Sequence, residues 1–496
     1  MVDIEIKVID SVHLKITCEK SISKELSQYF TFKVPNYKYH PAYRNKMWDG
    51  QIRLYNLHKR TLYVGLIDYL LEFAMDRNYT VKSEYNIKEK LTKDKTKDFV
   101  ENILKPTVSG EYVVPHDHQI NAINHAINRE RCLLLSATGS GKSLIIYAIM
   151  RYYLTLLPKE SKILIIVPTT NLVSQMFSDF SDYSSKSEWS AKKNCYKIYQ
   201  GADKNTNRRV VISTWQSLYN QPVAYFDQYN VIFGDEAHLY KAKSLTGIME
   251  KMRRCPYRIG TTGTLDNSKT HKLVTEGLFG KLYRVANTKE LMNKNILTNL
   301  NIDCITLKHD KKDINEIKRA KYHEEIKWLV ENKKRNNFIV NLTKILKGNT
   351  LVLFNYVETH GKPLYNAIIE ANIDSKNCFM IYGGTDADQR EEIRKRFDKE
   401  DSAVLVASYG TCSTGINIKN IHNIIFASPS KSVVRVLQSI GRGLRKSESK
   451  DEVNLYDISD DMRYGKYINH TLKHFGERIK IYNNESFEFR QIEINI

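Results

Sequence analysis

Residues 133–143 read LLLSATGSGKS, and this stretch decides how the rest of the chain is interpreted. Three leucines predict a buried strand, the small residues after them predict a turn, and an apolar helical pattern starts at Lys142 and Ser143. A strand, a glycine-containing loop and a helix N-terminus together form a cradle for phosphate groups. Gly139 and Gly141 let backbone N–H groups approach the phosphates, while Lys142 places a positive charge near the β and γ oxygens. The Ser143 hydroxyl is placed to ligate Mg²⁺.

The loop is a variant that reads AxGxGKS over residues 137–143, because Ser136 stands where the usual GxxxxGK[ST] pattern has its first glycine. The residues assigned to nucleotide binding on this basis are Ala137, Thr138, Gly139, Ser140, Gly141, Lys142 and Ser143. A turn rich in glycine and serine that binds no ligand is the alternative that the loop alone leaves open.

The composition favours a multidomain protein with a polyanionic partner. With 496 residues the chain is too long for one ordinary core, so two or three domains are expected. Its 76 lysines and arginines exceed its 56 acidic residues, and the resulting charge of +20 favours nucleic acid or an anionic membrane surface. No apolar run approaches the roughly 20 residues of a spanning helix, and the start MVDIEIKVID does not resemble a signal peptide. Scattered cysteines without a CxxC pair indicate reduced thiols, so we expect a cytoplasmic location.

The pattern of apolar residues predicts an α/β protein, in which a small α+β domain precedes two parallel-sheet domains. Residues 1–88 mix strand-like and helical patterns, and the charged residues 89–105 are expected to form a linker or an exposed helix. From residue 106 onward helix and strand patterns alternate, which is typical of parallel α/β sheets. We therefore expect one such domain at 106–290, a second at 291–460 and a helical tail at 461–496.

Ten strands are expected in the two sheets, and a polar bridge near residues 289–301 separates the two sets. The expected strands are 132–135, 163–167, 210–214, 231–233 and 258–260 in the first domain, and 350–354, 379–382, 404–407, 424–427 and 454–457 in the second. The basic stretch 311–337 reads as a solvated helical face or as one side of a nucleic-acid path.

Residues 33–60 combine positive charge with aromatic rings. They carry seven lysines and arginines but one acid, Asp49, and tyrosines and a tryptophan are interleaved. Cations for the phosphate backbone and rings for base stacking are typical of nucleic-acid binding. Lys46, Trp48 and Arg53 are the candidate contacts. An ordinary α+β domain with a charged, tyrosine-rich face explains the same composition and remains open.

Two adjacent carboxylates form the second chemical signal. In VIFGDEAH, residues 231–238, an apolar strand ends at Asp235 and Glu236. Phosphoryl transfer to water needs a carboxylate that holds the metal and a group that orients or deprotonates the water. We expect Asp235 to hold Mg²⁺ and Glu236 to act as the base.

A pair of arginines forms the third signal, in the second parallel-sheet domain. Arg442 and Arg445 of QSIGRGLR, residues 438–445, lie three positions apart and share one face if the segment is helical. The planar guanidinium stays charged and bridges phosphate oxygens, as in an arginine finger. A basic helix surface is the alternative reading.

Taken in order, these stretches resemble the motifs of superfamily 2 helicases of the DEAH type over residues 115–450. The resemblance implies that Gln119 reads the adenine ring and that motif V contributes ribose and backbone contacts through Thr414, Gly415 and Asn417. The residues that it implies for contact with the nucleic-acid backbone in the first domain are Thr169, Thr170, Thr214 and Gln216. It further implies that His238 relays the nucleotide state toward Thr262 and Thr264 or toward Gln438, although a structural core histidine explains His238 equally well.

A closer resemblance is to the UvsW-type ATP-dependent DNA helicases of T-even bacteriophages, because residues 48–54, WDGQIRL, are similar to their WDGRIRL stretch. It implies a nucleic-acid-binding N-terminal domain, two tandem RecA-like domains and a helical tail. It also implies an enzyme that uses ATP and Mg²⁺ to remodel branched DNA (forks, Holliday junctions, D-loops and R-loops) in recombination, repair and replication. Separately, we expect a monomer. The expected partners are single- or double-stranded DNA or RNA–DNA hybrids, without a membrane. An RNA helicase, or an ATP-driven duplex translocase or annealing protein without processive unwinding, remains the alternative.

Overall fold

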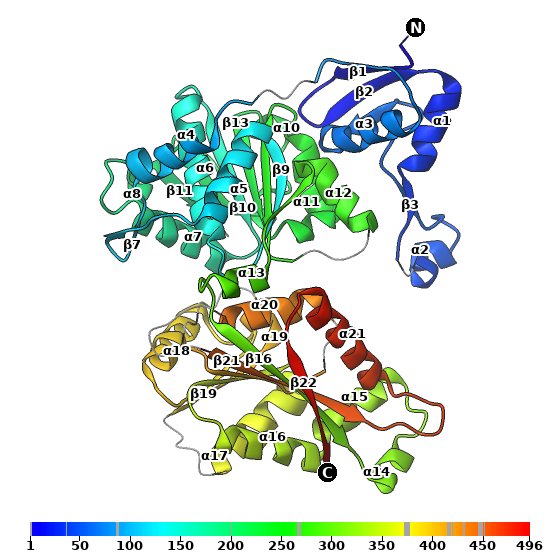
Figure 1. Cartoon of the computed structure of the whole chain (residues 1–496), viewed down its shortest axis with the longest axis vertical. Coiled ribbons are helices and arrows are strands. Elements are labelled where there is room, and N and C mark those ends of the chain that lie inside the picture. Colours follow the sequence, from blue (N-terminus) through cyan, green and yellow to red (C-terminus); the bar gives the residue numbers. More distant parts are fainter. Residues whose placement is uncertain are drawn as a thin grey trace. The chain divides into compact units, whose positions relative to one another are not determined.

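The computed structural model describes residues 2–496 except 36, 86–88, 200, 265–268, 372–376, 414–417, 419, 430–431, 445–449 and 451. The chain forms two compact units (Figure 1). The first unit contains Met1–Ser136 and Gly141–Ala286, and the second contains Asn287–Ile496 together with Ala137–Ser140. Among the described residues, no helix is both long enough and apolar enough to cross a lipid bilayer.

The first unit begins with the small α+β domain that the sequence predicts. Its four-stranded sheet, in the order β5-β2-β1-β6, consists of β1 (Ile4–Val8), β2 (His13–Cys18), β5 (Thr61–Tyr63) and β6 (Val81–Ser83). Apolar side chains of α1 (Lys20–Tyr29) and α3 (Ile67–Asp76) share one buried cluster with these strands. A separate antiparallel ribbon of β3 (Thr31–Lys33) and β4 (Gln51–Arg53) carries the short helix α2 (Pro41–Arg44) between its strands.

A seven-stranded parallel sheet follows in the first unit, in the order β11-β12-β10-β13-β14-β9-β15. Its strands are β9 (Arg131–Ser136), β10 (Lys162–Val167), β11 (Cys195–Ile198), β12 (Val210–Thr214), β13 (Tyr229–Asp235), β14 (Tyr257–Thr262) and β15 (Leu282–Ala286). Because the strands are parallel, the loops that leave β9, β10, β12, β13 and β14 all lie at one edge of the sheet.

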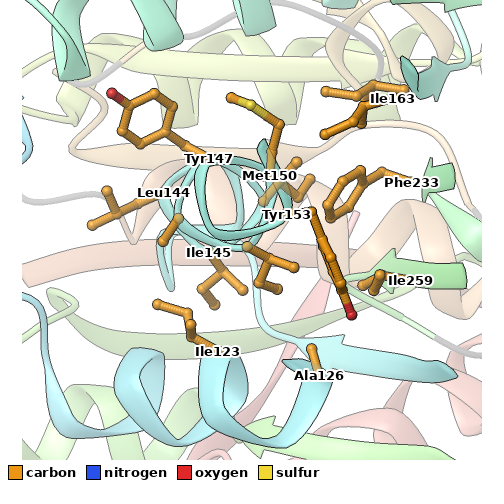
Figure 2. Close-up of a cluster of buried hydrophobic side chains, with 14 of the residues drawn as sticks. Ile123, Ala126, Leu144, Ile145, Tyr147, Met150, Tyr153, Ile163, Phe233 and Ile259 are labelled. Carbon is orange, nitrogen blue, oxygen red and sulfur yellow. The ribbon is translucent and has the colours of Figure 1, made fainter. Parts of the chain in front are cut away.

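The helix α6 (Lys142–Leu156) is surrounded by apolar side chains. Figure 2 shows Ile145 toward Ile123 and Ala126 of α5 (Asp117–Arg129), and Tyr153 toward Phe233 of the sheet. A helix that is apolar on nearly all sides is typical of the buried core. Its packing therefore fixes where the helix begins, and with it the position of the preceding glycine-containing loop.

The second unit contains another seven-stranded parallel sheet, in the order β18-β19-β17-β20-β21-β16-β22. Its strands are β16 (Asn299–Lys308), β17 (Thr350–Phe354), β18 (Cys378–Ile381), β19 (Val404–Ser408), β20 (Asn423–Phe426), β21 (Glu452–Asp461) and β22 (Phe489–Asn495). The helices between and around these strands are α13 (Thr288–Asn293), α14 (Lys311–Glu316), α15 (Tyr322–Glu331), α16 (Lys333–Ile345), α17 (Lys362–Glu370), α18 (Ala387–Lys399), α19 (Tyr409–Ser413), α20 (Val433–Gly443) and α21 (His470–Asn484).

The architecture confirms the predicted fold class of two tandem RecA-like domains after a small α+β domain, and it contains all ten expected strands. The structure differs at the C-terminus, where a helical tail was expected. The helix is present as α21, but β22 follows it and pairs with β16 along its length, so this segment completes the second sheet. The expected polar bridge at 289–301 likewise contains α13 and the start of β16. In the charged stretch 89–105, Val100 and Leu104 are buried in the core of the first parallel sheet.

Candidate nucleotide and nucleic-acid sites

The loop between β9 and α6 has the shape that its glycines permit. Gly139 and Gly141 have φ values of 84° and 85°, a left-handed conformation that glycine adopts without a steric penalty. Within the loop, Ser140 donates its hydroxyl to the Ala137 carbonyl at 2.6 Å. At the start of α6, Lys142 Nζ donates to the Ser136 carbonyl at 3.2 Å, which brings the ammonium back over the loop.

Gln119 lies directly against this loop. Its Oε1 accepts a hydrogen bond from the His116 backbone N–H at 2.9 Å as part of a capping box at the start of α5. A Cβ atom added to Gly141 would lie 2.1 Å from Gln119 Nε2. The glycine therefore allows a close approach between the predicted adenine-reading side chain and the predicted phosphate loop.

The two carboxylates lie where β13 ends. Asp235 is the last residue of the strand, and Glu236 adopts a left-handed conformation with φ 50° and ψ 50°, which is unusual for a residue with a side chain. Asp235 Oδ1 accepts a hydrogen bond from Thr261 Oγ1 of β14 at 2.9 Å. Burial and the adjacent Glu236 carboxylate raise the pKa of Asp235 to about 6, although Lys142 counteracts this shift.

These residues fit a magnesium ion in their chemistry. Carboxylate and hydroxyl oxygens are the ligands that Mg²⁺ prefers, and Asp235 and Ser143 supply one of each. An aspartate whose charged form is disfavoured by burial and by a second carboxylate gains from a nearby divalent cation.

His238 connects the carboxylate pair to the next strand. Its Nδ1 lies 3.2 Å from Glu236 Oε2 and 3.0 Å from Thr262 Oγ1, and Thr262 Oγ1 in turn donates to the Thr264 carbonyl at 2.7 Å. Thr262 and Thr264 are both buried. The structure thus brings together His238, Thr262 and Thr264, three of the four residues predicted to couple hydrolysis to movement.

The four predicted backbone contacts of the first domain line one groove. This groove has a volume of about 800 Å³. Thr169 caps α7 (Thr170–Tyr183) by accepting a bond from the Leu172 N–H at 3.4 Å, and Thr214 Oγ1 lies 3.0 Å from Ser217 Oγ. The lining residues are Pro168, Thr169, Thr170, Tyr199, Gly201, Ala202, Lys204, Thr214, Gln216, Ser217 and Asn220. Sequence reasoning missed Tyr199, Lys204 and Asn220, since no motif marks them and β11, which leads to Tyr199, was not expected.

The three candidate contacts of the N-terminal domain lie on or beside the β3–β4 ribbon. Lys46 is exposed and has a left-handed φ of 55°. Trp48 is half-buried, and its Nε1 donates to the Gln51 carbonyl at 2.9 Å. Arg53 forms two hydrogen bonds with Asp49, so part of its charge is neutralised within the ribbon.

The remaining predicted residues belong to the second unit, where the description is partial. Gln438 is half-buried on α20, and Arg442 lies on the same helix, although its side chain is outside the description. Arg445, Thr414, Gly415 and Asn417 lie outside the described residues.

Comparison with known proteins agrees with this arrangement. Three protein families match the chain: the N-terminal domain of the DNA helicase UvsW over residues 3–84, the res subunit of type III restriction enzymes over 112–267, and the conserved C-terminal helicase domain over 333–447. The chain is 33% identical to the ATP-dependent DNA helicase UvsW of Enterobacteria phage T4, and the match covers 100% of both. The crystal structure of T4 UvsW matches at 31% identity with a TM-score of 0.53, again over 100% of both chains.

A more distant structure shares the fold. The ATP-dependent type ISP restriction-modification enzyme LlaBIII bound to DNA matches at 17% identity with a TM-score of 0.55, over 78% of this chain and 32% of that chain. At this identity the match concerns the fold alone. The full-length similarity to the phage T4 protein is what defines the family. The chain belongs to the UvsW family of superfamily 2 helicases and is therefore an ATP-hydrolysing enzyme.

Proposed function

We propose that this enzyme is a DNA helicase that uses ATP hydrolysis to remodel branched DNA (forks, Holliday junctions, D-loops and R-loops) in the cytoplasm of a host cell. The observation that carries the proposal is that one domain holds both Lys142 beside Asp235 and the groove lined by Thr169, Thr170, Thr214 and Gln216. The name of the phage T4 relative, an ATP-dependent DNA helicase, supports DNA as the substrate.

In the proposed hydrolysis step Glu236 acts as the general base. Its side chain is held beside His238 at the end of β13, and it takes a proton from the water that attacks the γ-phosphate. Lys142 and the backbone N–H groups of residues 137–143 hold the phosphates, and Gln119 contacts the base. Asp235 and Ser143 would hold a magnesium ion, which neutralises phosphate charge when bound. On sequence grounds we assign Arg442 and Arg445 to the γ-phosphate as arginine fingers.

We propose that His238 couples ATP hydrolysis to movement of the DNA. Because His238 Nδ1 lies within 3.2 Å of both Glu236 Oε2 and Thr262 Oγ1, a change at Glu236 on hydrolysis alters the hydrogen bond to Thr262 and then the Thr264 carbonyl. The groove residues would hold the DNA backbone differently in the two nucleotide states, and this difference in binding energy makes a motor. Lys46, Trp48 and Arg53 would add contacts to the branch point.

The variant Glu236→Gln tests the role of the base. We expect steady-state ATP turnover to fall by about 10²–10⁴-fold, the range for loss of a general base, while ATP and DNA affinities stay near those of the wild type. The matched control is Glu111→Gln, an exposed glutamate of the short strand β8 (Glu111–Tyr112), which should turn over ATP like the wild type. Turnover in Glu236→Gln equal to that of the control would remove Glu236 from this role.

A substrate panel tests the choice of nucleic acid. ATP turnover is measured with single-stranded DNA, a fork, a Holliday junction, an R-loop and RNA at equal nucleotide concentration and fixed salt. The proposal expects the branched DNA substrates to stimulate turnover most. Stimulation by RNA alone would favour the RNA helicase instead.

A further inference from the structure

A tight, exposed turn joins β21 to α21 in the second unit. Residues 463–467, RYGKY, form what we call the tyrosine turn, which belongs to the orange segment between these two elements in Figure 1. The Tyr464 N–H donates to the Tyr467 carbonyl at 3.1 Å, and the Tyr467 N–H donates back to the Tyr464 carbonyl at 2.9 Å. Gly465 has a φ of 54°, and 45% of Tyr464 is exposed to solvent.

Positive side chains gather at the tyrosine turn. Lys318 Nζ, from the segment between α14 and α15, lies 3.5 Å from the centre of the Tyr464 ring, and Lys473 Nζ of α21 lies 5.6 Å from that of Tyr467. Arg319 and Lys466 are also exposed. Within the described part of the chain, none of these four cations forms an ion pair with a carboxylate. Arg463 differs, because three side-chain hydrogen bonds of 2.9, 3.0 and 2.6 Å pair it with Asp461.

The base of the turn is held by a buried polar network. The Asn469 side chain accepts a bond from the Met462 N–H at 3.1 Å and donates to the Asp460 carbonyl at 3.0 Å, which closes the turn. Glu325 of α15 accepts bonds from the backbone N–H groups of His470 and Thr471 at 2.9 and 2.7 Å and so caps α21. Asn469 and Glu325 are each 1% exposed. Because these buried hydrogen bonds fix the base of the turn, less ordering is needed when its exposed tip binds a ligand.

The turn also lies at the edge of the sheet where ligands bind. It follows the carboxyl end of β21, which runs parallel to β16 and β20, and β20 runs parallel to β17. In open parallel sheets ligands bind at the carboxyl ends of the strands. The loop after β17 leaves the same edge.

We infer that the tyrosine turn, with Lys318, Arg319 and Lys473, is a further binding site for single-stranded nucleic acid. The exposed Tyr464 ring offers a base its face opposite Lys318. Cations that form no ion pair with a carboxylate among the described residues suit the phosphate backbone beside it. Stacking needs unpaired bases, which favours a single strand over a duplex. This inference rests on the proposed function in that DNA is taken as the substrate, but the site lies outside the predicted motifs.

The test compares two labelled oligonucleotides, a dT 20-mer and an abasic 20-mer of equal charge, bound to the full-length protein. Tyr464→Ala should weaken dT binding by about tenfold, within the range for loss of one stacked base, and change abasic binding less than twofold. Lys466→Ala should weaken both, and the slope of log affinity against log salt should fall by about 0.7, as expected for one lost contact to a single-strand phosphate. Tyr464→Phe keeps the ring and should bind dT like the wild type.

Tyr112→Ala is the matched control. Tyr112 is 58% exposed and lies under Lys186 Nζ at 4.9 Å in the first unit, so it reproduces a surface tyrosine paired with a lysine elsewhere in the chain. Its loss should leave both affinities unchanged, and thermal unfolding of every variant checks that it is folded.

Three results would contradict the inference. Wild-type affinity and salt slope in Tyr464→Ala and Lys466→Ala would show that the turn does not touch the strand. Equal weakening of dT and abasic binding by Tyr464→Ala would overturn base stacking and leave a polyanion contact of another kind. If instead the wild type itself binds neither oligonucleotide and its ATP turnover is not stimulated by DNA, the proposed function fails first.

Discussion

At the scale of single residues, two glycines with the same backbone conformation allow the effect of backbone strain to be distinguished from an effect on nucleotide binding. Gly141 and Gly110 have nearly equal φ values of 85° and 82°. A Cβ at Gly141 would lie 2.1 Å from Gln119 Nε2, whereas nothing lies within 4 Å of one at Gly110. Alanine at either position therefore has the same unfavourable dihedral angle, which costs roughly 1–2 kcal/mol, but at Gly141 it also displaces Gln119.

We expect Gly110→Ala to lower the unfolding temperature while ATP affinity stays that of the wild type. Gly141→Ala should lower ATP affinity at least tenfold in addition, because the phosphate loop and Gln119 cannot both keep their positions. Titration with a fluorescent ATP analogue and thermal unfolding measure the two effects. If both variants bound the analogue equally well, the contact between Gln119 and the loop would have no part in nucleotide binding.

At the scale of elements, the strands that the sequence predicts are those with continuous apolar runs, such as KILIIV in β10. The short strand β11, CYKI, and the edge strands β15, LYRVA, and β22, FRQIEIN, interrupt their apolar residues with charged or polar ones, so their pattern resembles a loop or an amphipathic helix. The same limit applies to the sites. The phosphate loop and the pair Asp235–Glu236 are each a continuous sequence motif, so the sequence predicts them. The groove residue Tyr199 and the tyrosine turn belong to no motif, because their neighbours come from distant parts of the chain.

We predict that the strand β22 contributes to the stability of the second sheet. Ile492 and Ile494 pack against the core of the second sheet, whereas Gln491, the residue before Ile492 on β22, is exposed. The double variant Ile492→Ala/Ile494→Ala should lower the free energy of unfolding by about 2–4 kcal/mol. This is less than two fully buried Ile→Ala substitutions would cost, because both side chains are only partly buried. Urea denaturation followed by circular dichroism measures it, with Gln491→Ala as the control near the wild-type value. A loss no larger than that of the control would mean that β22 does not belong to the sheet in solution.

At the scale of the whole molecule, the N-terminal domain is built into the first unit rather than tethered to it. Leu273 of α12 (Lys269–Phe279) is buried in the core of the N-terminal domain. Tyr69 of α3 donates to Glu276 at 2.8 Å, and Lys281 pairs with Glu72 at 2.6 Å. Glu276 itself is fully buried and also accepts the Leu282 N–H at 2.8 Å. Burial accordingly raises the pKa of Glu276.

The close packing of the N-terminal domain against α12 requires a glycine at position 65. A Cβ at Gly65 would lie 2.1 Å from the Glu276 carbonyl oxygen and 2.7 Å from that of Gly277, and backbone oxygens cannot move aside as a flexible side chain can. Gly65→Ala should therefore separate the N-terminal domain from α12, so that a single cooperative unfolding transition of the first unit splits into two in calorimetry. Gly476→Ala, on α21 with open space around the added methyl group, is the control and should leave the transition unchanged. If the transition stays single in Gly65→Ala, the domain is held by its side-chain contacts, such as buried Leu273, and not by close backbone packing. If it splits, close packing of the domain fixes the position of the proposed DNA contacts Lys46 and Trp48. Branched-DNA affinity should then fall in the same variant, although none of the proposed DNA contacts was changed.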